Sequence, residues 1–174
     1  MGIVKTHPDE LLVVGLLYSD SASEKRARAM LENHYGPIAE LTGEEVFLWT
    51  DYYCPEMGQR IFRRYLAFER LFNPSLLASI KLKTNEIEGM LACEGRRLVN
   101  LDPGMLGPGR FCLATTKDRA HRIPLGGGIL AELTLLYERG CFHPLPWTYP
   151  DWASEPVREM LACWRKRLFK TSAG

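Results

Sequence analysis

The sequence predicts an α+β protein with a ferredoxin-like βαββαβ core over residues 1–104. A C-terminal antiparallel extension and a final helix follow over residues 105–174, within a single domain. In the first half, apolar runs and helically periodic segments alternate as strand, helix, strand, strand, helix, strand. In the second half, short apolar runs are separated by glycine-rich turns and precede one amphipathic segment.

The first strand and helix are predicted from residues 11–34. Residues 11–17 are apolar with β-branched members, which is typical of a buried strand. A helix is predicted over residues 24–34, with Ser21 or Ser23 as its cap and Gly36-Pro37 ending it.

The middle of the chain supplies two strands, a helix and a further strand. Residues 45–50 predict the second strand. Residues 60–72 fit either a helix or a strand, and we favour the strand because Asn73-Pro74 starts a helix directly after it. That helix places apolar residues at three- and four-residue steps up to Leu91, and Gly95 closes it. A strand over residues 97–101 is expected to stop at the turn Asp102-Pro-Gly104.

The second half predicts strands over residues 110–115, 119–123, 129–137 and 141–145, joined by turns rich in glycine. Prolines 144, 146 and 150 predict an extended segment before a helix that Ser154 caps. The apolar stripe of this helix consists of Val157, Met160, Leu161, Trp164 and Leu168. We expect the stripe to pack on the domain itself; the alternative is a homodimer interface.

Composition excludes several classes of protein. A formal net charge of +1 creates no field that would attract nucleic acid or an anionic membrane. Apolar runs are shorter than a membrane span, and the first residues do not resemble a signal peptide, so we expect a cytoplasmic protein without a membrane partner. The five cysteines are odd in number and lack C-x-x-C spacing, which argues against disulfide frameworks, metal ribbons and redox motifs.

A polar cluster follows the apolar run at residues 110–114 and is the candidate site. Hydroxyls, cations and free backbone N–H groups at the end of a strand can hold a phosphate or a carboxylate. The alternative is ordinary turn chemistry, in which these side chains bond nearby backbone. The predicted ligand-binding residues are Thr115, Thr116, Lys117, Arg119, Arg122 and Asp102.

Glu132 gains a basic neighbour in either register of the predicted hairpin. A two-residue turn places His121 opposite Glu132, whereas a three-residue loop places Arg122 there. In the functional interpretation, Glu132 orients His121 as a general base or Arg122 as an anion clamp. Asp118 is the third candidate catalytic residue. In the structural interpretation, the pair is a cross-strand ion pair, which is the more frequent role.

Other ligands have weaker support in the sequence. Carboxylates could bind Mg²⁺ if two polar loops met, and these would be Asp51, Glu56, Asp102, Asp118 and Glu132. No other cofactor is predicted, since the histidines lack zinc spacing. RNA binding would use the basic end of the final helix and a sheet face with Phe62 and Tyr65, but the low net charge disfavours it. The sequence thus favours a small-molecule-binding protein, enzyme or not, over an RNA-binding module or a structural, partner-binding protein.

Seven stretches across nearly the whole chain resemble the bacterial family catalogued as domain of unknown function 4416. They are LYSD at 17–20, TDYY at 50–53, EMG at 56–58, IKLKTN at 80–85, VNLDPG at 99–104, ATTKD at 114–118 with HRI at 121–123, and WTYPD at 147–151. The family has no established activity, although some members carry a GTP-binding label. The sequence lacks the glycine loop and lysine of a P-loop. In addition, Asp118 comes one residue too early for the guanine-reading Thr-Lys-x-Asp pattern. We therefore predict no GTP binding of the P-loop type.

Overall fold

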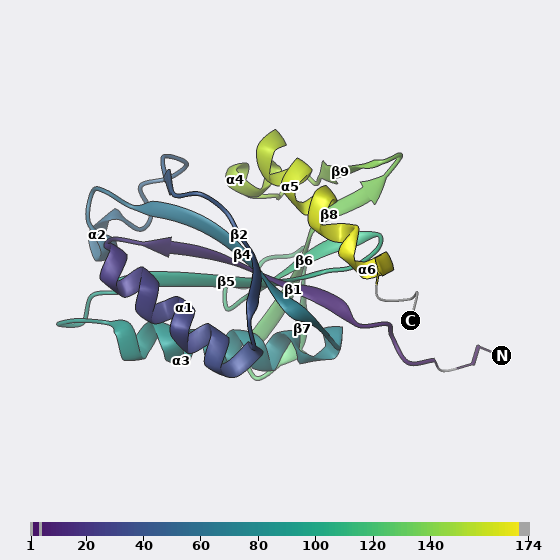
Figure 1. Ribbon diagram of the computed structural model, residues 1–174, viewed down its shortest axis with the longest axis horizontal. Helices are drawn as coiled ribbons and strands as arrows, with labels where there is room; N and C mark the ends of the chain where they lie inside the picture. The colour runs from purple at the N-terminus through teal and green to yellow at the C-terminus, as the bar shows by residue number, and fades with distance from the viewer. Residues whose placement is uncertain (1, 4, 171–174) are drawn as a thin grey trace.

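The computed structural model describes residues 2, 3 and 5–170, and within these ranges it is a mixed α/β protein (Figure 1). The strands are β1 (Glu10–Tyr18), β2 (Ile38–Leu41), β3 (Glu45–Val46), β4 (Phe62–Phe72), β5 (Val99–Leu106), β6 (Arg110–Thr115), β7 (Arg122–Gly126), β8 (Ile129–Glu138) and β9 (Cys141–Pro144). The helices are α1 (Ser21–Tyr35), α2 (Cys54–Met57), α3 (Leu77–Leu91), preceded by a 3-10 turn (Pro74–Leu76), α4 (Pro150–Ala153), α5 (Glu155–Arg165) and α6 (Arg167–Lys170).

The described strands form one large antiparallel sheet in the order β2-β4-β1-β5-β6-β8-β7. β3 pairs with β4, and β9 pairs with β8. The sheet is therefore larger than the four-stranded sheet of a simple ferredoxin-like fold, because the C-terminal strands continue it instead of forming a separate layer.

β1 lies inside the sheet, between β4 and β5, and is buried along its whole length. On one face, Leu12 and Leu16 belong to a core shared with α1 and α3. On the other face, Leu11 and Val13 belong to a core shared with α4 and α5. A strand buried on both faces requires an uninterrupted apolar sequence, which explains the run predicted at residues 11–17.

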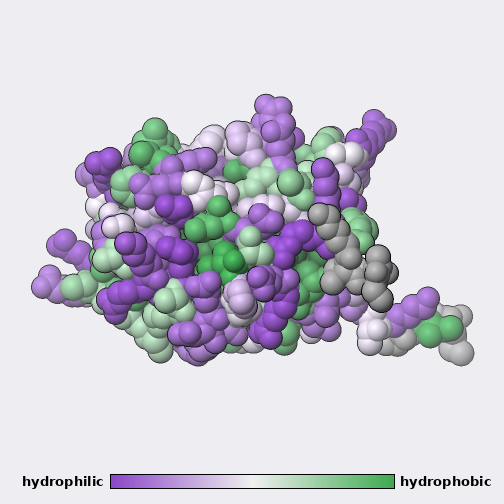
Figure 2. All heavy atoms as spheres, viewed as in Figure 1, coloured by the Kyte–Doolittle hydropathy of each residue, from purple (hydrophilic) through white to green (hydrophobic). Residues whose placement is uncertain are grey.

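Helices cover the sheet on both faces (Figure 1). α1 and α3 lie on one face, and α4 and α5 lie on the other. Trp164 of α5 is 6% exposed and packs with Val157 and Leu161 in the second core, so the apolar stripe packs on the chain's own sheet. With the apolar side chains gathered in these cores, the face shown in Figure 2 is largely hydrophilic.

The strand predicted at residues 60–72 is confirmed as β4, whereas several other boundaries were wrong. The strand predicted at 45–50 is only Glu45–Val46, and the sequence reading missed β2 at the edge of the sheet. α1 is capped by the side chain of Asp20, which accepts a hydrogen bond from Ser23 N at 2.8 Å. Pairing with β4, which is distant in the sequence, decided the bounds of β2 and β3, whereas the Asp20 cap is a local contact between residues three positions apart.

The predicted turn at Asp102-Pro-Gly104 was also wrong, because β5 continues through it to Leu106. All of β5 pairs with β1, with Pro103 opposite Val14. A Cβ atom on Gly104 would lie 2.6 Å from the ring of Phe111, so glycine here allows β5 and β6 to approach closely instead of making a turn.

Two predictions for the C-terminal part of the chain also had wrong boundaries. The strand expected at residues 119–123 is observed as Arg122–Gly126. The segment expected to be extended up to the last helix contains α4, Pro150–Ala153. Ser154 stands at the start of α5 as predicted, but its hydroxyl donates to Asp151 O instead of capping the helix.

Candidate functional site

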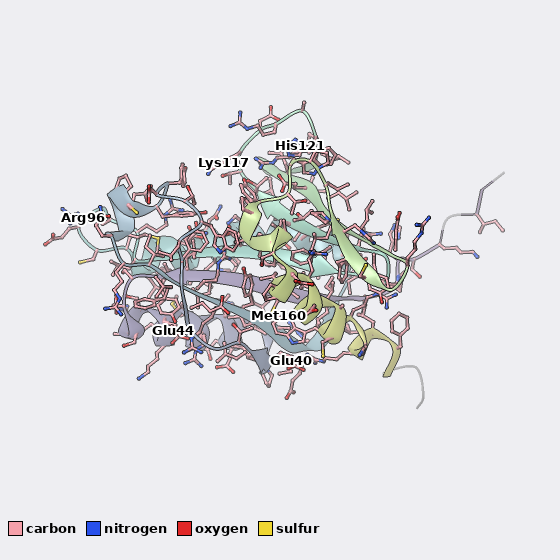
Figure 3. All side chains as sticks on the ribbon, turned by 90° about the horizontal axis from the view of Figure 1, so that it is seen from above. Glu40, Glu44, Arg96, Lys117, His121 and Met160 are labelled. Atoms are coloured by element: carbon pink, nitrogen blue, oxygen red, sulfur yellow. The ribbon has the colours of Figure 1, made fainter. Side chains whose placement is uncertain are left out.

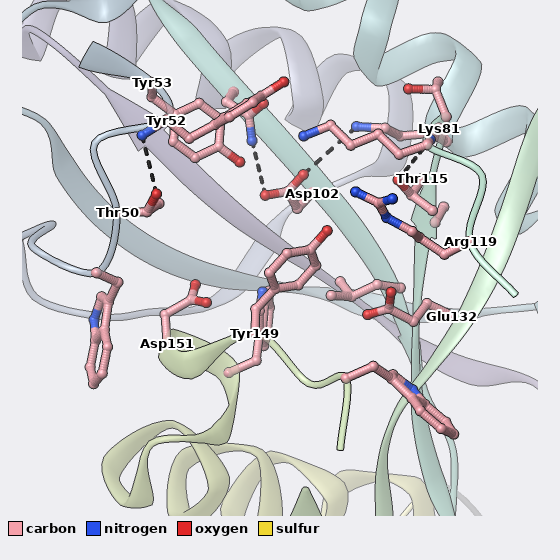
Figure 4. Close-up of a pocket in the computed structure, with 18 of the residues that line it drawn as sticks. Thr50, Tyr52, Tyr53, Lys81, Asp102, Thr115, Arg119, Glu132, Tyr149 and Asp151 are labelled. Carbon is pink, nitrogen blue, oxygen red and sulfur yellow. Dashed lines mark hydrogen bonds and ion pairs between the residues drawn. The ribbon is translucent and has the colours of Figure 1, made fainter. Parts of the chain in front are cut away.

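A cavity of about 830 Å³ opens where β5 and β6 stop pairing (Figure 4). The β5–β6 register covers Gly104–Leu106 and Phe111–Leu113. Beyond that register, Asn100 and Asp102 of β5 and Thr115 of β6 line the cavity. The remaining walls come from β4, α3, β7, β8, α4, Arg97 and the loops around residues 47–53, 116–121 and 147–149.

Two side chains of α3 complete the edge of β5 inside this gap. Glu88 accepts a hydrogen bond from Leu101 N at 2.7 Å, and Lys81 donates to Leu101 O at 2.6 Å. They satisfy backbone groups that a neighbouring strand would otherwise pair. Burial raises the pKa of the Glu88 carboxyl, against the opposing charge of Lys81.

The same network extends to the predicted ligand-binding residue Asp102. Its carboxylate lies 3.9 Å from Lys81 Nζ and accepts a hydrogen bond from Asn100 Nδ2 at 2.9 Å. Arg97 donates to Asn100 Oδ1 at 2.8 Å and lies 3.5 Å from Glu88. Asp102 therefore faces the cavity from a strand, and its charge is already balanced.

Arg63 of β4 forms a buried ion pair with Asp151 of α4 at the base of the cavity. The guanidinium lies among aromatic rings, with its carbon 4.9 Å from the ring centre of Tyr65 and 5.6 Å from that of Trp152. Arg63 is 5% exposed, and its Nε and Nη1 atoms have no hydrogen-bond partner among the described residues. Both donors are therefore buried without an acceptor among the described residues.

Glu132 of β8 contacts both His121 and Arg122, the two basic residues that the alternative hairpin registers predicted as its neighbours. Arg122 lies opposite it and donates to Glu132 Oε2 at 2.7 Å, and His121 Nε2 lies 3.1 Å from the same oxygen. The His121 ring stacks on Trp147, with centroids 4.7 Å apart. Glu132 is 1% exposed, and its second oxygen, Oε1, has no partner in the part of the chain that the structure describes.

Arg122 also joins the neighbouring loops to this pair. It donates to Lys117 O at 2.6 Å and to the hydroxyl of Tyr149 at 2.8 Å. The loops around residues 116–121 and 147–150 are thus both fixed to a buried guanidinium, which limits the freedom of this part of the cavity wall.

The polar turn after β6 shows both ligand-accessible groups and ordinary turn bonding. Thr115 Oγ1 accepts from Lys117 N at 3.2 Å, which is the local bond expected of a turn. The Lys117 ammonium lies 3.8 Å from the ring centre of Tyr52. The Arg119 side chain has no hydrogen bond or ion pair to any described residue, and Figure 4 shows it extending into the cavity. Lys117 and His121 lie on the same side of the molecule (Figure 3).

The structure brings most of the predicted site residues to one cavity. Those that line it are Asp102, Thr115, Thr116, Lys117, Arg119, His121, Arg122 and Glu132. The third candidate catalytic residue, Asp118, is exposed and does not belong to the lining.

Sequence reasoning missed the deep charged residues and the aromatic walls. The missed residues are Arg63, Lys81, Glu88, Arg97 and Asp151, with the aromatic residues Trp49, Tyr52, Trp147 and Tyr149. A signal was present: Arg63 interrupts an apolar strand, and Lys81 lies on the buried face of α3 beside Ile80 and Thr84. Charged residues at core positions are almost always paired or functional.

Neither a metal centre nor a membrane helix is found in the described part of the chain. No three His, Cys, Asp or Glu side chains among these residues could hold a metal ion together. Of the carboxylates considered for Mg²⁺, Glu56 instead pairs with Arg97 at 2.9 Å. No helix within residues 2, 3 and 5–170 is long and apolar enough to cross a membrane.

Comparison with known proteins identifies a family but no function. No curated protein and no solved structure matches the chain. One protein family, described as "Domain of unknown function (DUF4416)", matches residues 8–168. Since this match covers nearly the whole chain of 174 residues, the chain belongs to the DUF4416 family.

Proposed function

We propose that the cavity binds an anionic or phosphorylated small molecule. The observation that carries the proposal is an imbalance of charge. Every acidic side chain of the lining already has a cationic partner: Glu88 and Asp102 with Lys81, Glu132 with Arg122, and Asp151 with Arg63. Lys117 and Arg119 have no carboxylate partner among the described residues. Positive charge therefore stays uncompensated on one wall, and an anion would neutralise it.

The size and the chemistry of the walls also support a small organic ligand. A volume of about 830 Å³ suits a small molecule, since ligand pockets typically span roughly 300–1,000 Å³. Thr115 and Thr116 line the same cavity as Lys117 and Arg119 and add hydroxyl groups to its polar surface. Aromatic side chains at 49, 147 and 149 supply apolar surface around these polar groups.

Titration of the whole chain with a phosphomonoester tests this proposal. Propyl phosphate should bind to the wild-type protein and raise its melting temperature. The Lys117→Ala/Arg119→Ala variant should bind at least tenfold more weakly, and the difference should shrink at high salt. Arg26→Ala, which removes an exposed cation from α1, is the matched control. Equal affinity in all three proteins would contradict an anion site on this wall.

His121 is the residue that we propose as a general base if the bound molecule is also converted. Glu132 Oε2 accepts a hydrogen bond from Arg122 and is a carboxylate oxygen, which can only accept. We therefore expect the His121 Nε2 atom beside it to carry the ring proton and to donate it to Oε2. Nδ1 would then remain unprotonated and could accept a proton from a ligand. Nitrogen NMR of the imidazole tests this tautomer, and a proton found on Nδ1 at neutral pH would contradict the assignment.

The alternative of an RNA-binding module has less support. In the final helices, Arg165 donates to Pro108 O at 2.5 Å and Arg167 donates to Phe68 O at 3.1 Å, so both bind the chain itself. Trp164 and Tyr65 lie in the second core and offer little surface for stacking on bases.

We also propose a ferredoxin-like core within the larger sheet. The consecutive strands β2-β4-β1-β5 are antiparallel, and α1 and α3 lie on one of their faces. This arrangement supports the expected βαββαβ order for residues 1–104. An experimental structure whose strand order differs from this one would reject the assignment.

A further inference from the structure

We infer that the ligand is a polyhydroxylated organic anion, in which one end carries the charge and neutral hydroxyls fill the depth of the cavity. This inference rests on the proposed function and adds the chemistry of the uncharged part of the molecule. It comes from buried polar atoms of the lining that lack partners among the described residues: Arg63 Nε, Arg63 Nη1 and Glu132 Oε1.

Glu132 requires a hydrogen-bond donor. Its Oε2 atom accepts from Arg122, whereas Oε1 is buried without a partner in the described chain. Figure 4 shows the carboxylate on the cavity side, near Arg119 and Tyr149. A buried acceptor without a donor is unfavourable, so a group from outside the chain should supply one.

Arg63 requires an acceptor. Its Nη2 atom donates to Asp151, while Nε and Nη1 remain unpartnered within the described residues. The rings of Phe47, Tyr65 and Trp152 surround the guanidinium and offer no carbonyl or hydroxyl oxygen in hydrogen-bond reach. Nη1 lies against β1 at Gly15, so an oxygen from the ligand would accept from Nε.

The charges of Arg63 and Glu132 are already balanced within the chain. The ligand groups that bond to them should therefore be uncharged. Asp151 neutralises Arg63, and Arg122 neutralises Glu132. A second carboxylate or ammonium at either place would bury a net charge, which is costly. A hydroxyl both donates and accepts and carries no charge, so hydroxyl groups fit both positions.

The charged group of the ligand should lie where the cavity has cations that no carboxylate of the described chain neutralises. Lys117 and Arg119 are cations without carboxylate partners, so the phosphate or carboxylate of the ligand should lie there. Trp147 and Tyr149 line the same cavity, and the flat face of the Tyr149 ring, which Figure 4 shows in the cavity, suits the carbon–hydrogen face of a polyol. A phosphorylated or carboxylated sugar-like molecule combines all of these features.

A matched pair of ligands isolates the contribution of the hydroxyls. Glycerol 3-phosphate and propyl phosphate share the charge and the three-carbon chain and differ only in two hydroxyls. Isothermal titration of the wild-type chain should show glycerol 3-phosphate binding at least tenfold more tightly. Glycerate and propanoate form the corresponding carboxylate pair. A preference seen only with the phosphate pair identifies a phosphorylated polyol, and one seen only with glycerate identifies a carboxylated polyol.

The Glu132→Gln variant assigns the preference to its residue. An amide that still accepts from Arg122 turns its NH2 group toward the ligand and cannot accept there. The advantage of glycerol 3-phosphate over propyl phosphate should fall to less than threefold, because the acceptor for the ligand hydroxyl is lost, whereas the loss of the Glu132 charge beside Arg122 strengthens the binding of both phosphates alike. Glu138→Gln makes the same change at the exposed end of β8 and should behave as wild type.

The outcomes separate this inference from the proposed function. Equal binding of glycerol 3-phosphate and propyl phosphate to the wild-type chain would overturn the inference and leave the anion site standing. If neither phosphate nor carboxylate ligands bind, both proposals fail. Because the wild-type comparison needs no substitution, a Glu132→Gln protein that does not fold would not remove the test.

Discussion

Arg63 and Asp151 form a buried ion pair between β4 and α4, although 88 positions separate them in the sequence. The pair joins the first half of the chain to the C-terminal helices at the base of the cavity. Trp152, the residue after Asp151, packs against the same guanidinium. The same contact therefore stabilises the fold and positions residues of the cavity.

Removing one member of this pair should be strongly destabilising. Asp151→Ala leaves an unpaired buried guanidinium, and we expect it to lower the free energy of unfolding by about 3–5 kcal/mol. Urea denaturation measures the change, with the exposed Glu155→Ala as the control. The Arg63→Met/Asp151→Leu double variant should recover most of the loss, because it buries no charge. A cost for Asp151→Ala as small as that of Glu155→Ala would show that the pair is not buried in solution.

Gly15 on β1 leaves the space that Arg63 and Trp152 fill. A Cβ atom there would lie 2.8 Å from Trp152 Cζ2 and would also collide with Arg63 Nη1. We expect Gly15→Ala to cost about 1–3 kcal/mol of stability through overpacking. Gly89→Ala on α3 meets no atom within 4 Å and should be neutral or stabilising by up to about 1 kcal/mol. Thermal unfolding of both variants checks the contrast, and equal effects would argue against a tight fit at Gly15.

Trp164 should stabilise the single chain rather than a dimer. Its side chain lies in the core between α5 and the sheet, so Trp164→Ala should cost about 3–5 kcal/mol. Met90→Ala, at an exposed position of α3, is the control and should cost far less. Denaturant melts at two protein concentrations distinguish the alternatives. A midpoint that does not depend on concentration supports packing within the chain, whereas one that rises with concentration supports a homodimer.

Asp20 should contribute stability that depends on pH. Its carboxylate caps α1, and the hydrogen bond from Ser23 N lowers the pKa of this group below its ordinary value of 3.8. Because the folded state favours the ionised form, the contribution is complete above about pH 3.8 and is lost as the pH falls below that value. Asp20→Ala should cost about 1 kcal/mol at pH 7 and much less near pH 2. Urea melts at the two pH values measure this, with the exposed Asp9→Ala as a control. An Asp20→Ala effect that is independent of pH would rule out an ionised cap.

Local sequence patterns determined much of the architecture. The apolar run of β1, the periodic helix α3 and the stripe of α5 bury surfaces that their own residues define, so composition and spacing predicted them. The polar turn at residues 115–122 was recognisable for the same reason, because hydroxyls and cations gather there within a few positions. The basic neighbours of Glu132 also followed from hairpin geometry alone.

Only the tertiary structure decided how this turn becomes a cavity. β5 runs through Pro103 because β1 pairs with it along its whole length, and no local signal contains that pairing. Lys81 and Glu88 enter the site because β6 stops pairing with β5 and leaves Leu101 to be satisfied by side chains of α3. Asp151 reaches Arg63 only when the last helices cover the sheet. Periodicity along the chain reports which face of an element is buried, whereas contacts between distant charges depend on how the elements assemble.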